Sequence, residues 1–510
     1  MKAKLIRCLV LALIIAGCFA CLPPAAQARL PYHTYTYDYW GDVVYSPAAY
    51  LPNRLITGED LGIGTLRTPT DLFVGNDGKV YILDAGNGRI VVTNDRWELV
   101  RVIDGFENNG VPDRFNNPSG IFVTEEGHIY VADTDNGRLV ELNPEGKFVR
   151  EIGPPQSDII KDDFIYQPTK LVVDRAGRIY VVARHVNQGL IELMPDGTFR
   201  SYMGASRVAL NMVDYFWKMI ATREQRERMA LFVPTEYNNL CIDEEGFIFV
   251  TTSALNEWDI QRTIDSRSED DRYAPIRRLN LMGNDILRRR GYFPPVGDIL
   301  IARRGSVRGP SMLVDVAVDD TVRVYSVLDR RRGRIFTYDS EGNLLYVFGA
   351  IGERFGNFRN PVALDYLDDK ILVLDYETGT VTEFTVTAYG RLIRDAVHLH
   401  FIGKYDEAAA CWEEVLLQNA NYEMAYVGIG RAFLRQRKFE EAMKNFKLGN
   451  HRKYYSRAFY YHRREVIGRN FGLIVGVLAA CFLALYIIIR VREKSQKSAY
   501  GEYQSEVREI

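Results

Sequence analysis

The stretch PSGIFVTEEGHIYVADTDNGRLVEL, residues 118–142, carries the pattern from which the fold can be predicted. It begins with proline and an apolar segment, turns at acidic residues and glycine, and enters a second apolar segment that ends in Asp133. A Gly-Arg turn then leads into a third apolar segment. Short apolar runs separated by turns of this kind predict consecutive antiparallel strands.

The same pattern recurs along most of the chain, as in PTDLFVGNDGKVYILDAGNGRIVV at residues 69–92. Its six copies begin at Pro69, Pro118, Pro168, Pro234, Pro310 and Pro361. A lone small sheet cannot bury both of its faces, whereas a ring of such sheets gives each one two neighbours. The repeats therefore predict a mainly β domain built as a propeller.

The repeated strings resemble NHL repeats, most clearly in the first two copies. The resemblance implies a six-bladed β-propeller with four antiparallel strands per blade, which we place at residues 29–386. The last copy runs into helical sequence after Val386 without room for an outer strand, whereas the segment before Pro69 looks like the end of a blade. We therefore expect a strand at about 50–57 to complete the sixth blade and close the ring.

Two of the spacings between copies are long, and they place insertions at 205–232 and 254–309. The first carries Val213, Phe216, Trp217 and Ile220 at helical spacing and predicts a helix. The second contains a charged segment at 262–272, which is expected to be a loop. Insertions on propellers lie in loops, where binding surfaces are common, although each could equally pack on the blade rim.

After the propeller, GKYDEA at 403–408 and RKFEEA at 437–442 repeat with a period of about 34 residues. Trp412 in the first copy is matched by Phe446 in the second. These segments resemble tetratricopeptide (TPR) repeats, and we assign residues 387–468 to a TPR-like helical module. The resemblance implies a site for peptides or partner helices.

The two ends of the chain are hydrophobic. Residues 1–28 combine basic residues, an apolar run and a small-x-small site, and predict a secretory signal peptide, with lipidation at Cys18 as the alternative. Residues 471–489 carry no charge and are long enough for one transmembrane helix. With a signal peptide, the bulk of the chain is expected outside a cell membrane, followed by a short cytoplasmic tail at 490–510.

Overall composition points to no particular partner, since the formal net charge is -2 and 25% of residues are charged. No nucleic-acid partner, cofactor or metal site is expected. The resemblance includes lyases and lactonases with a metal in the central channel, but only His128 and His185 lie within the repeats, at positions that are not equivalent. Zinc needs about three protein ligands directed at one point.

An aspartate ends the second apolar segment in four copies. In three of them an arginine follows five residues later, which predicts a structural ion pair in each of these blades; the pairs are Asp84–Arg89, Asp133–Arg138 and Asp329–Arg334. In the sixth copy Asp375 lacks this arginine, and we therefore retain Asp375 as a candidate ligand-binding residue.

Basic residues clearly outnumber acidic ones between residues 277 and 334. Such a segment is either a solvated loop face or an anion-binding surface. The candidate binding surface consists of Arg288, Arg289, Arg290, Arg303, Arg304, Arg330, Arg331 and Trp217, with Asp375.

These observations favour a non-enzymatic, membrane-anchored binding or scaffold protein outside the cytoplasm. It would recruit a protein partner of the cell envelope, or an anionic lipid or cell-wall polymer, through propeller loops and TPR-like helices. One alternative is a propeller enzyme of the lactonase or lyase type, which would require a metal in the channel. A second is a component of a transmembrane sensor.

Overall fold

The computed structural model describes residues 30–157, 160, 164–204, 236–253, 255–270, 272–301 and 307–506. The chain divides into two compact units, one ending at Thr387 and the other formed by Ala388–Ile510 with Asp38–Asp42. The predictions for residues 1–28, for the insertion 205–232 with Trp217, and for Arg303 and Arg304 lie outside the described residues.

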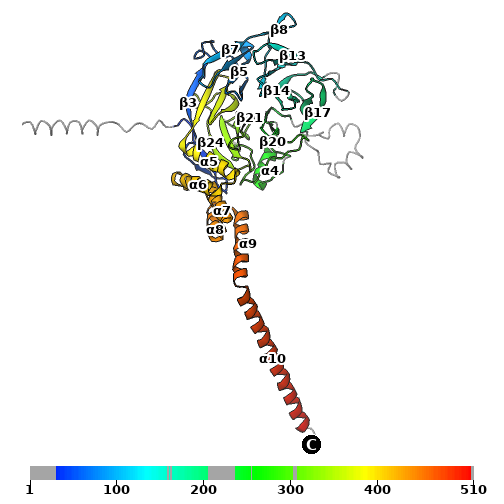
Figure 1. The fold of residues 1–510 in the computed structure, drawn as a ribbon, viewed down its shortest axis with the longest axis vertical. Coiled ribbons are helices and arrows are strands. Elements are labelled where there is room, and N and C mark those ends of the chain that lie inside the picture. Colours follow the sequence, from blue (N-terminus) through cyan, green and yellow to red (C-terminus); the bar gives the residue numbers. More distant parts are fainter. Residues whose placement is uncertain are drawn as a thin grey trace, which may run out of the picture. The chain divides into compact units, whose positions relative to one another are not determined.

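The first unit is a six-bladed β-propeller, as predicted (Figure 1). Blades 1 to 3 each contain four antiparallel strands joined in chain order. These strands are β4 (Asp71–Val74), β5 (Val80–Asp84), β6 (Arg89–Thr93) and β7 (Leu99–Ile103); β10 (Gly120–Val123), β11 (Ile129–Asp133), β12 (Arg138–Leu142) and β13 (Phe148–Ile152); and β14 (Pro168–Val173), β15 (Ile179–Ala183), β16 (Gly189–Leu193) and β17 (Phe199–Gly204).

Blades 4 to 6 depart from this plan in different ways. Blade 4 has three described strands, blade 5 gains two strands from the N-terminal segment, and blade 6 takes its fourth strand from the start of the propeller. The strands are β18 (Asn239–Ile242), β19 (Ile248–Thr251) and β20 (Ile276–Leu279); β21 (Leu313–Asp319), β22 (Val324–Asp329), β23 (Arg334–Asp339) and β24 (Leu344–Phe348), with β1 (Tyr35–Tyr37) and β2 (Val43–Tyr45); and β25 (Pro361–Leu367), β26 (Lys370–Asp375), β27 (Thr380–Val386) and β3 (Tyr50–Thr57).

The position of each strand within its blade explains its composition. All five residues of β5, β11 and β15 are buried, because each of these second strands lies between two neighbouring blades. They are therefore apolar apart from the Asp that ends β5 and β11, as is typical of strands covered on both faces. The outer strands β7 and β13 are mostly exposed or half-buried, with one buried residue at the end of each, because they lie at the rim of the blade.

The ring closes through β3, which pairs with β27 along its whole length, from Tyr50 opposite Val386 to Thr57 opposite Thr380. The expected closing strand is therefore present. Tyr50 is fully buried, and its ring stacks on Phe348 of blade 5 at 5.3 Å. The closing strand thus completes the sheet of blade 6 and also packs against the neighbouring blade.

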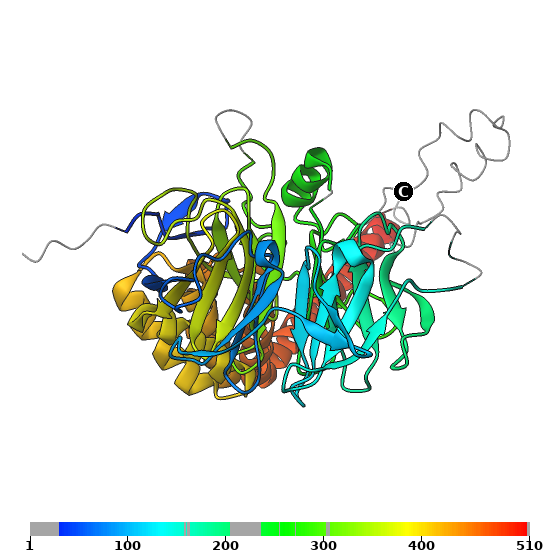
Figure 2. The same cartoon turned by 90° about the horizontal axis from the view of Figure 1, so that it is seen from above.

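Two short elements lie outside the repeat pattern. The hairpin of β8 (Phe106–Asn108) and β9 (Val111–Asp113) connects blade 1 to blade 2. The helix α4 (Glu257–Ser266) occupies part of the segment expected to be a charged loop, so that expectation was wrong for residues 262–266. Asn256 caps this helix, and Ile260 and Ile264 lie buried on one side of it at helical spacing. Figure 2 shows α4 standing beyond the ends of the blade strands.

The second unit is helical, with α5 to α9 following one another as neighbouring helices. Their bounds are α5 (Ala388–Phe401), α6 (Tyr405–Gln418), α7 (Glu423–Arg435), α8 (Phe439–Leu448) and α9 (Arg452–Arg469). Trp412 and Phe446, matched in the sequence, occupy corresponding places against α7. A Cβ atom at Gly430 would lie 2.7 Å from the ring of Phe446, and one at Gly428 would collide with the indole of Trp412.

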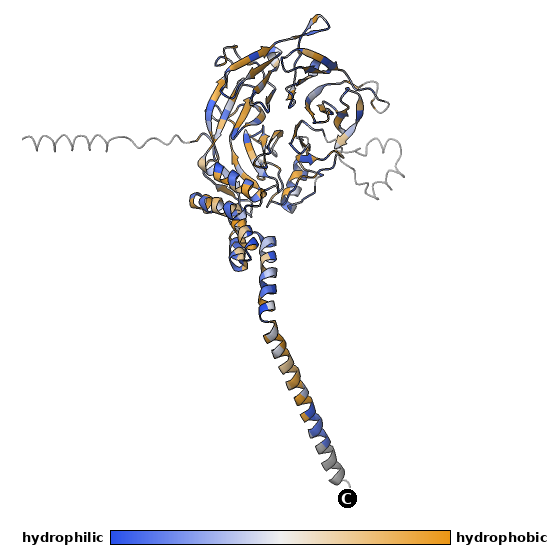
Figure 3. Cartoon of the chain, viewed as in Figure 1, coloured by the Kyte–Doolittle hydropathy of each residue, from blue (hydrophilic) through white to orange (hydrophobic). Residues whose placement is uncertain are grey.

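The last helix, α10 (Phe471–Glu506), is long and apolar over Phe471–Lys497, a length sufficient to cross a membrane. None of that apolar window is buried inside the protein, and its large apolar side chains are exposed. Figure 3 shows the hydrophobic residues gathered in the first part of α10 and hydrophilic residues following them. The apolar part is consistent with the span expected at 471–489. The helix continues past Ile489 because the residues that follow, mainly Arg, Glu, Lys and Gln, are good helix formers.

Candidate functional site

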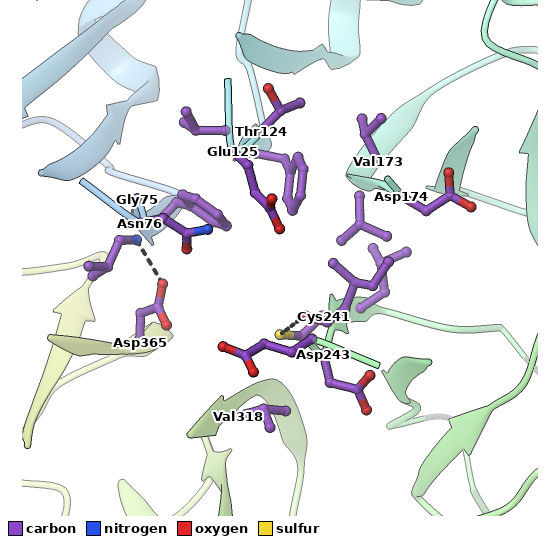
Figure 4. Close-up of a pocket in the computed structure, with 18 of the residues that line it drawn as sticks. Gly75, Asn76, Thr124, Glu125, Val173, Asp174, Cys241, Asp243, Val318 and Asp365 are labelled. Carbon is purple, nitrogen blue, oxygen red and sulfur yellow. Dashed lines mark hydrogen bonds between the residues drawn. The ribbon is translucent and has the colours of Figure 1, made fainter. Parts of the chain in front are cut away.

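The innermost strands of all six blades surround a central cavity of about 1230 Å³. It is lined by residues of β4, β10, β14, β18, β21 and β25 and by the turns that connect these strands to the second strands. We call the face that carries these turns the cavity face. Figure 4 shows Glu125, Cys241 and Asp365 around the cavity, from blades 2, 4 and 6.

Acidic side chains dominate the cavity lining. They far outnumber the basic residues there, which are Lys170, Arg175 and Arg178. Several acidic groups already have partners: Arg178 pairs with Asp174 at 2.6 Å, and Arg175 pairs with Glu125 at 3.0 Å. The cavity therefore favours cations electrostatically, although some of its charge is neutralised within the blades.

Three cavity carboxylates join one blade to the next. Each accepts a hydrogen bond from a backbone N–H on the inner strand of the following blade. These bonds link Asp71 to Ile121 at 2.8 Å, Asp315 to Leu364 at 2.6 Å, and Asp365 to Val74 at 2.7 Å. They satisfy inner-strand donors that have no partner within their own sheet, so these carboxylates contribute to the stability of the ring.

Burial and charge raise the pKa of the deepest carboxyl groups. Burial first, and the nearby carboxylate of Asp71 second, raise the pKa of Asp315 to about 8 although Lys170 opposes the shift. Lys170 forms an ion pair with Asp71, so the same ammonium group interacts electrostatically with the carboxyl groups of both Asp71 and Asp315. Burial likewise raises the pKa of Asp365 to about 7 and that of Asp320 to about 6.

These shifts predict that the propeller is more stable in mild acid. A carboxyl group whose pKa is raised by folding holds its proton in the native state, so stability is lost as pH rises from about 4 towards 8. We expect the melting temperature of the full-length chain to fall between about pH 5 and pH 8. Asp315→Asn should flatten that slope, as measured by thermal melts across the pH range. An unchanged slope in Asp315→Asn would show that Asp315 is ionised in the fold.

Cys241 and His128 are the candidate nucleophile and general base that line the cavity, and the contacts of both lie within the fold. Burial, followed by the carboxylates of Asp365 and Asp315, raises the pKa of the Cys241 thiol, which therefore stays protonated. His128 pairs through Nδ1 with Glu141 at 2.8 Å, and Glu141 accepts a second bond from Arg150. Among the residues described by the structure, no group of three or more His, Cys, Asp or Glu is placed to hold a metal ion.

The opposite face of the ring carries the turns between the second and third strands, and we call it the clasp face. There the predicted ion pairs of blades 1 and 2 are present: Asp84 with Arg89 at 2.7 Å and Asp133 with Arg138 at 2.9 Å. Asp133 also accepts a hydrogen bond from the backbone N–H of Asn116. The aspartate therefore ties the segment entering the blade to the turn leaving its second strand.

In blade 5 the predicted pair was wrong. Arg334 pairs with Asp298 rather than with Asp329, because Asp298 comes from the second insertion and lies closer. Asp329 instead contacts Arg332 at 3.4 Å. The ion pair expected from the repeat, Asp329 with Arg334, is thus replaced by two others, and the buried carboxylate of Asp329 still has a cationic partner.

Asp375, which we retained as a candidate ligand-binding residue, lies among backbone hydrogen-bond donors. It is 2% exposed, and its carboxylate accepts hydrogen bonds from the backbone N–H groups of Arg359, Asn360, Glu377 and Thr378 at 2.6–3.1 Å. These four donors occupy the acceptor positions that a ligand would need. Asp375 therefore has the same clasp role as Asp133, with backbone groups in place of the arginine.

The arginine run of the candidate surface divides into exposed and buried members. Arg289 is buried, forms an ion pair with Asp285 at 2.5 Å and donates to the carbonyl oxygen of Ile276 at 2.8 Å. It is a structural residue, which corrects its assignment to a binding surface. Arg288 and Arg290 are exposed, because successive side chains of an extended segment point to opposite sides.

The other arginines of the candidate surface divide between the two ends of blade 5, with Arg290 at one end and Arg330 and Arg331 at the other. Arg290 is held beside the turn between β23 and β24, where its backbone N–H donates to Glu341 at 2.8 Å. Arg330 and Arg331 belong to the turn between β22 and β23, and Arg331 donates to the carbonyl oxygen of Pro310 at 2.7 Å. Consecutive turns of an antiparallel sheet lie at opposite ends, so Arg290 does not share a surface with Arg330 and Arg331.

Sequence comparison matches the NHL repeat to residues 115–142, which include β10, β11 and the Asp133–Arg138 clasp. No curated protein matches the chain significantly.

Several solved structures are similar to this chain at low sequence identity. The virginiamycin B lyase of Staphylococcus aureus is 10% identical, with a TM-score of 0.36 over 69% of this chain and 87% of the lyase. A putative gluconolactonase is 12% identical, with a TM-score of 0.39 over 70% of this chain and 98% of that one. The β-propeller domain of Myceliophteria thermophila Cps50 (Swd1) is 10% identical, with a TM-score of 0.38, over 66% of this chain and all of the domain. Identities and TM-scores this low say nothing about the activity of the present chain. The chain therefore contains an NHL repeat at residues 115–142 and folds as a six-bladed β-propeller followed by a helical C-terminal region.

Proposed function

We propose that this chain is a non-enzymatic, membrane-anchored binding or scaffold protein whose propeller and helical module lie outside the cytoplasm. The observation that carries the proposal is the exposed apolar part of α10, which follows the folded units directly and is covered by no other part of the described chain. Its 19 residues from 471 to 489 extend about 28 Å, close to the hydrocarbon thickness of a bilayer.

The helical region supports a recruiting role. Consecutive helices α5 to α8, with Trp412 and Phe446 in matching positions against α7, have the arrangement of TPR-like helix pairs. Helix pairs of this kind present grooves for peptides and partner helices. The clasp aspartates and the half-buried Cys241 thiol, by contrast, are engaged in the fold and do not suggest a reacting group.

We place the partner surface of the propeller on the cavity face, where Arg288 and Arg290 are exposed. Arginine is common among the residues that dominate binding interfaces. The Arg288→Ser, Arg290→Ser double variant should therefore weaken partner capture at least about tenfold without shifting the thermal melt. Capture is measured by crosslinking full-length chain in native membranes, followed by affinity purification.

The control is Arg289→Ser, which removes the partner of the buried Asp285 and should lower the melting temperature. Protease added to intact cells should cut the propeller, and elemental analysis of the purified chain tests for the metal that a lactonase or lyase would require. A protected propeller would contradict the outward orientation, and unaltered capture by the double variant would exclude Arg288 and Arg290 from the partner surface.

A further inference from the structure

The helix α9 packs on α8 by one side only. Tyr454 stacks on Phe446 with ring centroids 5.4 Å apart, and Tyr461 stacks on Phe439 at 5.8 Å. Ala458, between them, is fully buried. The spacing of these three residues along α9 places them on one face of the helix, so the opposite face is turned away from α8.

That opposite face combines exposed aromatic and aliphatic side chains with positive charge. Tyr455, Phe459 and Tyr460 are 37%, 46% and 50% exposed, and Val466 and Ile467 are also exposed. The basic residues of α9 are Arg452, Lys453, Arg457, Arg463, Arg464 and Arg469, against the one acidic residue Glu465. All of these charged side chains are exposed. The guanidinium of Arg463 lies 6.0 Å from the ring of Phe459, so the two kinds of side chain are interleaved.

The position of α9 in the chain limits what this face can meet. Only Asn470 separates the end of α9 at Arg469 from the start of the apolar helix at Phe471. At 1.5 Å per residue, an 18-residue helix is about 27 Å long, so every residue of α9 lies within about 30 Å of the start of that span. If α10 crosses a bilayer, the C-terminal turns of α9, which carry Arg463, Arg464 and Arg469, lie within about 12 Å of the start of the span, next to the lipid headgroups.

We infer that α9 docks along the outer surface of the bilayer and binds the headgroups of anionic phospholipids with its exposed face. Basic side chains are attracted to lipid phosphates, while Tyr and Phe suit the boundary between headgroups and acyl chains. Lipid is the partner that the position of α9 favours, because its exposed basic residues directly precede the apolar part of α10 and outnumber its acidic residues six to one. This inference rests on the proposed membrane anchoring by α10.

The test uses the full-length chain in lipid nanodiscs, one set of phosphatidylcholine alone and one containing phosphatidylglycerol. Hydrogen–deuterium exchange of peptides from 452–469 should be about tenfold slower in the anionic discs, while α7 and α8 exchange at the same rate in both. In the Arg463→Gln, Arg464→Gln double variant this difference should disappear. Two arginines near an anionic surface together shift such an equilibrium about 30-fold.

A matched control removes the same charge elsewhere on the module. Lys444→Gln with Lys447→Gln alters two exposed residues of α8 and should leave the lipid effect on α9 intact. Equal exchange of α9 in both discs, with the chain incorporated, would overturn the docking of α9 while leaving the anchor in place. Failure of the chain to enter either disc would overturn the anchor instead.

Discussion

Tyr50→Ala should lower the melting temperature of the propeller by about 8 °C. Tyr50 begins the closing strand, is fully buried, and packs on Phe348 at 5.3 Å and on Tyr346 at 5.8 Å. Truncating a large buried aromatic costs about 3–5 kcal/mol of unfolding free energy, because a cavity replaces its contacts. The space left by the Tyr50 side chain would lie between blades 5 and 6, where the two ends of the ring are joined.

The same strand supplies the control. Leu55 lies in β3 opposite Thr382 of β27 but is 43% exposed, so Leu55→Ala should change the unfolding free energy by less than about 0.5 kcal/mol. Differential scanning calorimetry of the full-length chain in detergent measures both variants. Deletion of residues 50–57 should have a larger effect than Tyr50→Ala. Equal melts for Tyr50→Ala and Leu55→Ala would mean that the seal of the ring lies elsewhere.

Trp412→Ala should unfold the helical module while leaving the propeller transition unchanged. Trp412 is 3% exposed, stacks on Tyr422 at 6.0 Å and fills the space left by Gly428. Its loss costs about 3–5 kcal/mol, which is a large share of the stability of so short a helical array. Separate unfolding is expected because the chain forms two compact units.

Limited proteolysis measures this effect, with cleavage sites located between Ala388 and Asn470. Leu417→Ala is the control on the same helix, since Leu417 is 80% exposed and should be dispensable. If Trp412→Ala also lowered the propeller transition, the two units would unfold together. If it left the module resistant to protease, the packing of Trp412 on α7 would contribute little stability.

The blades could be predicted because their signals repeat. Asp133 and Gly137 have counterparts in blade 1 at Asp84 and Gly88, and both glycines adopt a left-handed turn with φ of 63°. A Cβ atom at Gly137 would lie 3.0 Å from the carbonyl oxygen of Tyr166, so the turn favours glycine for space as well as conformation. Local requirements of this kind appear in the sequence as the same residue type at equivalent positions of successive repeats.

The residues that line the cavity show no such pattern. One equivalent position of the inner strands is occupied by Asp71, Gly120, Lys170, Asn239, Asp315 and Ala363, and of these Asp71, Lys170, Asn239 and Asp315 line the cavity. These residues are brought together only by the folding of the ring. The ion pair of Lys170 with Asp71, for example, joins blade 3 to blade 1, which are not consecutive in the sequence. No repeat search detects a contact of that kind.

The arginine surface shows a different limit. Arg288, Arg289 and Arg290 look equivalent as a charge run, yet the middle one is buried. The alternation of sides in an extended segment was a usable signal for this difference. The pairing of Arg334 with Asp298 in place of Asp329 could not be predicted from the sequence, because it depends on where the insertion folds.

The pairing of β3 with β27 also sets the order in which the molecule can be completed during its synthesis. β3 leaves the ribosome among the first strands of the propeller and β27 is the last, so nearly the whole ring must be made before they meet. Until then both β3 and the growing sheets present unpaired edges, which invite pairing with other chains. Such distant contacts make folding slow, so a nascent chain needs protection from aggregation until its final blade emerges.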